Sequence, residues 1–135
     1  MAQVFQSDAQ QGPVSDVPIV GTTETAVLRT NPLQPPFQTA KAKVVAIVNI
    51  ALGSDQTDLD VSIYRNPDDE NVLINSMDFS GLVSGSDVML AVGGVDKIPD
   101  PRQVTYLVTV KQAAGTADGN IYGNSQYIEA TLLSG

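Results

Sequence analysis

The sequence predicts an all-β fold: a single antiparallel β-sandwich, with a jelly roll favoured over an immunoglobulin-like strand order. Seven to eight short runs alternate between apolar and polar residues, and Gly, Pro, Asn and Asp separate these runs. No apolar stripe has the 3.6-residue period of a helix. Eight strands with long crossings between them are typical of the jelly roll. The 135 residues suffice for one domain around one core.

The strand pattern is clearest in the last third of the chain. In the run 104–110 the apolar and polar side chains occupy opposite faces, with Val104, Tyr106, Val108 and Val110 against Thr105 and Thr109. This pattern predicts a strand with one solvent-exposed face. A second run covers 126–133, and the segment between the two runs is rich in residues that tolerate positive φ. We therefore expect the chain to reverse there and to pair the two runs antiparallel with each other.

Earlier runs predict the remaining strands. The run 42–52 reads as a central strand, because its second face turns from charged at Lys41 and Lys43 to apolar at Val45 and Ile47. Residues 59–64 alternate cleanly, and the turn 66–71 returns the chain into a partner strand at 72–74. A further strand covers 88–92, where Gly93-Gly94 is expected to end it as a plain turn. Residues 18–29 supply one or two short strands, and the prolines of 31–36 predict an extended crossing between sheets.

The N-terminal segment differs in composition from the rest of the chain. Residues 1–17 are rich in Gln, Ser, Asp and Ala, whereas the sandwich is expected to cover 18–135. We expect an extended or flexible arm at 1–17, with two alternatives for its state. It is either a loosely packed terminus, or an extended segment that docks Val4 and Phe5 on a neighbouring subunit.

Composition excludes several classes of function. The chain has no Cys and no His, which excludes Ser-His-Asp and Cys-His catalysis and zinc sites built on those residues. We therefore expect no enzyme activity and no cofactor. The formal charge of −8 repels phosphate backbones, so nucleic acid is not an expected partner. The longest apolar run, 44–52, is about half the length of a transmembrane helix. Residues 1–8 lack the positive and apolar regions of a secretory signal, so we expect none there.

Two acidic segments are candidate cation sites. Asp55, Asp58 and Asp60 lie at near-alternate positions around a turn, an arrangement of oxygen ligands that could suit calcium. The segment lacks the glycine and the terminal glutamate of an EF-hand loop, and a solvated entry into a strand is the alternative. The run 68–70, Asp-Asp-Glu, is expected to be a solvated hairpin tip; a cation site shared around an oligomer axis and a pair of glycosidase carboxylates are the alternatives.

Three tyrosines could form a surface for binding sugars. Tyr106, Tyr122 and Tyr127 would stack on carbohydrate if they shared an exposed face. Tyr106 lies among valines in its strand, however, and this position favours burial.

The chain also resembles a family of viral proteins. The pattern Tyr106-x-Val108-x-Val110, the pair Gly115-Thr116, the closing run Ile128-x-Ala130-x-Leu132 and the earlier Val61-x-Ile63-Tyr64-Arg65 carry this resemblance. Over roughly residues 40–134 the texture is similar to the small jelly-roll domains of bacteriophage virion proteins, which serve as head decorations, spikes or fibre heads. The resemblance implies a structural protein on the capsid surface, a homotrimer or less often a pentamer, bound to other capsid proteins. A carbohydrate- or receptor-binding sandwich, with a surface glycan as partner, is the alternative.

Overall fold

The computed structural model describes residues 4–12, 17–19, 24–35, 40–51, 57–82, 87–99, 102–112 and 122–134. All regular structure in these residues is β-strand. In chain order the strands are β1 (Val4–Gly12), β2 (Val17–Pro18), β3 (Thr25–Arg29), β4 (Ala40–Ala51), β5 (Thr57–Arg65), β6 (Val72–Leu82), β7 (Asp87–Ile98), β8 (Tyr106–Gln112) and β9 (Tyr122–Ser134). Within the described ranges, no helix is long and apolar enough to cross a membrane.

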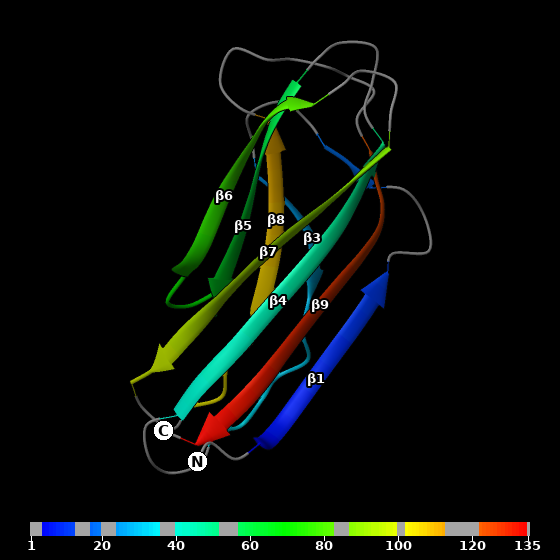
Figure 1. The fold of residues 1–135 in the computed structure, drawn as a ribbon. Helices are drawn as coiled ribbons and strands as arrows, with labels where there is room; N and C mark the ends of the chain where they lie inside the picture. Colours follow the sequence, from blue (N-terminus) through cyan, green and yellow to red (C-terminus); the bar gives the residue numbers. More distant parts are fainter. Residues whose placement is uncertain are drawn as a thin grey trace.

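The strands form two antiparallel sheets that pack face to face (Figure 1). Sheet A has the order β1-β9-β4-β7, with the short β2 also paired to β9, and sheet B has the order β3-β8-β5-β6. Four ladders are nested in the sequence, since β1 pairs β9, β3 pairs β8, β4 pairs β7, and β5 pairs β6. Such nesting is that of one long hairpin rolled into two layers. It confirms the predicted jelly-roll sandwich.

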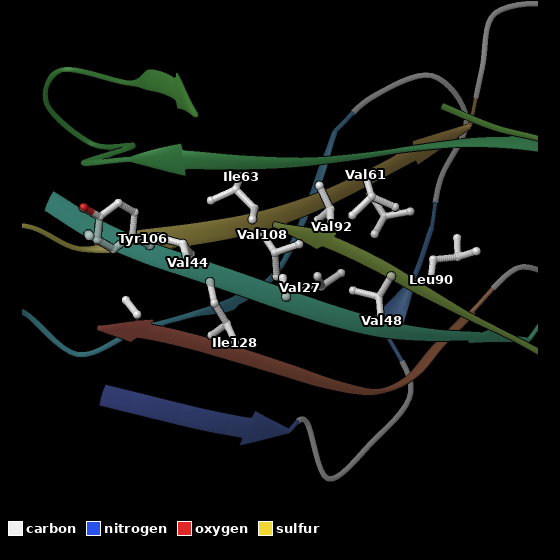
Figure 2. Packing of buried hydrophobic residues seen from close by; sticks show 14 of the residues in the cluster. Val27, Val44, Val48, Val61, Ile63, Leu90, Val92, Tyr106, Val108 and Ile128 are labelled. Carbon is white, nitrogen blue, oxygen red and sulfur yellow. The ribbon is translucent and has the colours of Figure 1, made fainter. Parts of the chain in front are cut away.

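The core lies between the sheets and consists of small aliphatic side chains. In β4 every second residue is 0% exposed from Ala42 to Ile50, and Leu59, Val61 and Ile63 of β5 face them from sheet B, also 0% exposed. Figure 2 shows these side chains interdigitating with others from β7, β8 and β9. The period-2 alternation of the sequence thus places its apolar half between the layers, which confirms β4 as a central strand. On the other face of β5, Asp60 and Tyr64 are partly exposed as expected, whereas Ser62 is 4% exposed.

The hairpin and the crossing predicted from turn residues are also confirmed. The β5–β6 turn contains Asn66 and Asn71 at φ of 48° and 52°, a region that Asn tolerates better than most residues. The proline-rich segment carries the chain from β3 in sheet B to β4 in sheet A. Within it, Leu33 is buried and forms an isolated bridge with Val104.

The expected pairing of the two C-terminal runs is wrong. Strand β8 lies in sheet B between β3 and β5, whereas β9 lies in sheet A between β1 and β4. The intervening segment 113–121 is long enough for a hairpin or for a crossing, because only about three extended residues span the roughly 10 Å between layers. The expected solvent-exposed face of β8 is only partly confirmed. Thr105 and Lys111 are partly exposed, whereas Leu107 and Thr109 are 7% and 4% exposed. Strand β8 is paired with β3 on one side and with β5 on the other, so neighbouring strands flank this face.

Gly93 and Gly94 do not end a strand, contrary to the expected turn. Both lie inside β7, which continues to Ile98. A Cβ at Gly94 would come within 3.1 Å of Ile74 Cγ2, and the amide of Asn75 donates a 2.6 Å hydrogen bond to the Gly93 carbonyl. Glycine here allows β6 of sheet B to approach the edge of β7 closely, a recognised role of glycine within strands.

The N-terminal segment is extended, but residues 4–12 belong to the sandwich. They form β1, which pairs with β9 from Val4 to Gly12. The backbone ladder holds β1 in place, and its polar composition suits an edge strand that faces solvent. Asp8 and Gln6 also accept hydrogen bonds from the backbone N–H groups of Asn31 and Gln34, at 2.9 and 3.0 Å. The expected boundary at residue 17 therefore does not separate β1 from the sandwich.

Candidate functional site

A buried polar network joins the two sheets at one end of the sandwich. Arg65 ends the inward-facing row of β5, and its guanidinium lies 2.6 Å from the carboxylate of Asp96 on β7. Both side chains are buried, at 7% and 5% exposed. The hydroxyl of Tyr106 on β8 donates a 2.7 Å hydrogen bond to the other carboxylate oxygen of Asp96, and burial raises the pKa of this phenol. The network is an interlayer clamp, because it fixes one end of sheet B against sheet A.

The clamp extends to the β5–β6 turn, where the acidic run 68–70 lies. Glu70 contacts Arg65 at 3.3 Å and Arg102 at 3.2 Å. A hydrogen bond from Asn66, supported by both guanidinium groups, lowers the pKa of Glu70 although partial desolvation opposes the change. Asp68 and Asp69 remain exposed and pair with arginines at 2.9 and 3.5 Å. The hairpin tip is therefore partly solvated, as expected, and its carboxylates are engaged by guanidinium groups.

A shallow pocket of about 220 Å³ opens beside this turn. Its lining is polar and consists of Asn66, Asp68, Asp69, Gln103 and Thr105. The Asn66 side chain accepts a hydrogen bond from the Thr105 backbone N–H at 2.8 Å, so part of the polar lining already serves the fold. The two carboxylates of the lining, Asp68 and Asp69, are each paired with an arginine. The pocket therefore offers hydrogen-bonding groups that are largely engaged by other residues of the fold.

The calcium candidates are only partly within the described residues. Asp55 lies outside them, and Asp58 and Asp60 lie on the outward face of β5. Asp60 is opposite Asp78 on one side and Lys111 on the other. A hydrogen bond with Asp78, together with desolvation and the charge of Asp78, raises the pKa of Asp60. Among the residues that the structure describes, no group of three or more acidic side chains is placed to hold a metal ion.

The tyrosines do not share a face in the part of the chain that the structure describes. Tyr106 is in the core, as its sequence position predicted, at 0% exposed. Tyr127 lies on the outer face of sheet A and donates a hydrogen bond to Glu129. Tyr64 lies on the outer face of sheet B, where its hydroxyl donates to Glu24 at 2.6 Å. Burial and this carboxylate raise the pKa of Tyr64 to about 12. The side chains of Tyr122, Val4 and Phe5 lie outside the described residues.

The outer face of sheet A is apolar at its centre. On β4 and β7 the side chains that point away from the core form a contiguous patch, which we call the sheet A patch: Val45, Ile47, Met89, Ala91 and Val95. Met89 and Val95 are 70% and 61% exposed. Sheet A is the near layer in Figure 1, and no described strand lies over it. A contiguous exposed apolar patch of this kind is typical of an interaction surface.

Charged side chains flank the sheet A patch at both ends. Lys41 and Lys97 are paired across β4 and β7, and Lys43 lies two residues further along β4. Asp87 lies at the opposite end of β7. The change from charged to apolar on β4 was visible in the sequence, whereas the continuation of the patch on β7 was not, because Gly93-Gly94 suggested a turn there.

Fold and surface together define the class: a jelly-roll β-sandwich with an exposed apolar sheet face and a polar interlayer clamp. No protein-family model and no curated protein matches the sequence. Several solved structures share the fold at low sequence identity, and they include viral capsid proteins.

One of these structures is Eiger TNF from S. frugiperda, at 10% identity and a TM-score of 0.59, covering 96% of this chain and 92% of that one. The VP2 subviral particle of infectious bursal disease virus matches at 14% identity and a TM-score of 0.58, covering 96% of this chain and 32% of that one. A chain of the T13 particle of the same virus matches at 10% identity and a TM-score of 0.55, covering 96% of this chain and 35% of that one. This chain thus spans about a third of each viral chain, and likeness at these identities shows the fold alone.

Proposed function

We propose that this chain is a structural protein of a virion: a decoration, minor capsid or spike component that assembles with copies of itself on the capsid surface. A homotrimer on a bacteriophage particle is the form that the sequence resemblance implies. In this role the protein stabilises the particle through contacts with its own copies and with other capsid proteins.

The sheet A patch is the observation that carries the proposal. Its five residues lie on two neighbouring strands and include two of the four large apolar side chains that are most exposed, Met89 and Val95. Burying apolar surface contributes about 25 cal/mol per Å², so association through this face is favourable. The jelly-roll fold shared with the viral capsid structures supports the same reading.

The proposal assigns no catalytic role. What supports this is the absence of His and Cys from the sequence, together with the engagement of the acidic turn by Arg29, Arg65 and Arg102. The clamp is assigned a structural role, because it holds the two layers together at the end where the acidic turn lies.

Light scattering on purified protein tests the proposal. The wild-type chain should elute with a mass of at least two copies of 14.2 kDa. Met89→Lys should reduce the mass toward one copy, because a charge in the sheet A patch must then be desolvated on association. Leu73→Lys is the matched control, since Leu73 is also large, apolar and exposed, at 52%, but lies on β6 in sheet B. A wild-type monomer at all concentrations would refute the proposed function.

A further inference from the structure

We infer that two copies of this chain bind each other through the outer face of sheet A about a two-fold axis, with β7 running antiparallel to its counterpart. The inference rests on the proposed function, because it names the surface and the symmetry by which copies meet. The occupant of the sheet A patch is thus a second copy of the same chain.

The outward row of β7 carries the pattern that specifies this partner. Read along the strand, its side chains are acidic, large apolar, small, small, apolar and basic: Asp87, Met89, Ala91, Gly93, Val95 and Lys97. Asp87, Met89, Ala91, Val95 and Lys97 are all exposed, and Gly93 is partly exposed. The two opposite charges lie ten residues apart, about 33 Å along the strand. Such a row is complementary to itself when it is reversed.

A two-fold axis in the plane of the interface and perpendicular to the strands performs this reversal. It places Asp87 of one copy opposite Lys97 of the other, at both ends of the contact. The same rotation places Met89 opposite Val95, and the small residues Ala91 and Gly93 meet at the centre, where they permit close approach. On β4 the same operation brings Val45 opposite Ile47. A face that meets itself about a two-fold axis is the commonest contact in homo-oligomers.

Charge favours this face over the rest of the surface. The charged residues on the outer face of sheet A are three lysines and two carboxylates, a formal charge of +1: Lys41, Lys43, Lys97, Asp87 and Glu129. Since the whole chain carries −8, the remainder carries −9. Two copies that met through other surfaces would bring like charges together, which costs association free energy. Contact through sheet A, with a formal charge of only +1 for each copy, makes this repulsion small.

The area of the face is close to what a stable contact needs. Four strands about 4.8 Å apart, each with a row of side chains about 33 Å long, give the outer face of sheet A an area of roughly 600 Å² in each copy. Specific interfaces bury about 800 Å² for each partner. Aligned packing of the two sheets would use most of this face.

Charge reversal tests the symmetry of the contact. Lys97→Asp alone and Asp87→Lys alone should each weaken self-association about tenfold or more, because each variant places two like-charged pairs across the interface. An equimolar mixture of the two variants should associate with near wild-type affinity, because every pair is then of opposite charge. The double variant should self-associate as the wild type does. Asp78→Lys, a reversal on the outer face of sheet B, is the matched control and should leave association unchanged.

The number of copies separates this inference from the proposed function. A ring of three copies requires contacts between different surfaces, whereas the two-fold contact joins two chains or two such rings. Light scattering should therefore give an even number of copies. A trimer, or charge variants that associate like the wild type, would overturn the two-fold contact while leaving the proposed assembly intact. A wild type that stays monomeric at all concentrations would refute both. Circular dichroism of each variant should retain the β-sheet spectrum, since all three substituted side chains are exposed.

Discussion

Asp96→Asn is the substitution that most sharply tests the interlayer clamp. It keeps the shape of the side chain but removes the charge that lies 2.6 Å from the Arg65 guanidinium. Both side chains are at least nine-tenths buried. Among the described residues, the guanidinium then keeps Glu70, at 3.3 Å, as its remaining ion-pair partner. Removing one partner of a buried ion pair costs about 3–5 kcal/mol. We expect the lower end, about 3 kcal/mol, because Glu70 remains.

Thermal and urea unfolding followed by circular dichroism measure this loss. For a domain of this size, about 3 kcal/mol corresponds to a fall in Tm of roughly 10 °C. Asp68→Asn is the matched control: the same substitution breaks a 2.9 Å pair with Arg29, but those side chains are 82% and 47% exposed. Exposed pairs contribute about 0–1 kcal/mol. Equal losses in the two variants would show that the buried pair has no special role and would refute the clamp.

Three further predictions concern single residues. Asp60→Asn should raise the free energy of unfolding at pH 7 by about 0.2–1 kcal/mol, because like charges opposite one another, here Asp60 and Asp78, are destabilising. The gain should shrink as pH falls through the raised pKa of Asp60. A loss of stability at pH 7 would contradict this prediction. Glu70 has a lowered pKa in the folded state. Its contribution to stability is therefore fully present above the unfolded pKa and is lost as pH falls through the folded pKa, so Glu70→Gln should flatten the acid side of the Tm profile below about pH 5. An unchanged profile would count against this prediction. Gly94→Val should lower the free energy of unfolding in urea by about 1–3 kcal/mol despite the high strand propensity of Val, because its Cβ would crowd Ile74. A more stable variant would show that β6 can move away.

The fold class followed from the sequence, while the strand partners did not. Alternation in β4 and β5 determines which side chains enter the core, and this is a local property that the order of apolar and polar residues shows directly. Which ladder a strand joins depends on contacts that are remote in the chain. The turn-rich segment between β8 and β9 therefore could not distinguish a hairpin from a crossing between layers. The pair Gly93-Gly94 failed for a related reason, because the close approach of β6 is a tertiary contact.

The candidate site shows the same division. Tyr106 was correctly placed in the core from its position among valines, but its hydrogen bond to Asp96 was not foreseen. A signal was present in the sequence: Arg65 continues the buried row of β5, and Asp96 continues the buried row of β7. Charged residues at inward positions of two strands predict a buried pair, since a lone buried charge is too costly. That Arg65 and Asp96 lie next to each other could be known only once the order of the strands in the two sheets was known.

The most direct test of the account is the chemical accessibility of the sheet A patch, because the chain has no native cysteine. Met89→Cys and Leu73→Cys each place one thiol on an exposed strand position, in sheet A and sheet B respectively. We predict that maleimide labelling at position 89 slows as protein concentration rises, while labelling at position 73 keeps a constant rate. Equal rates at both positions, independent of concentration, would contradict assembly through sheet A.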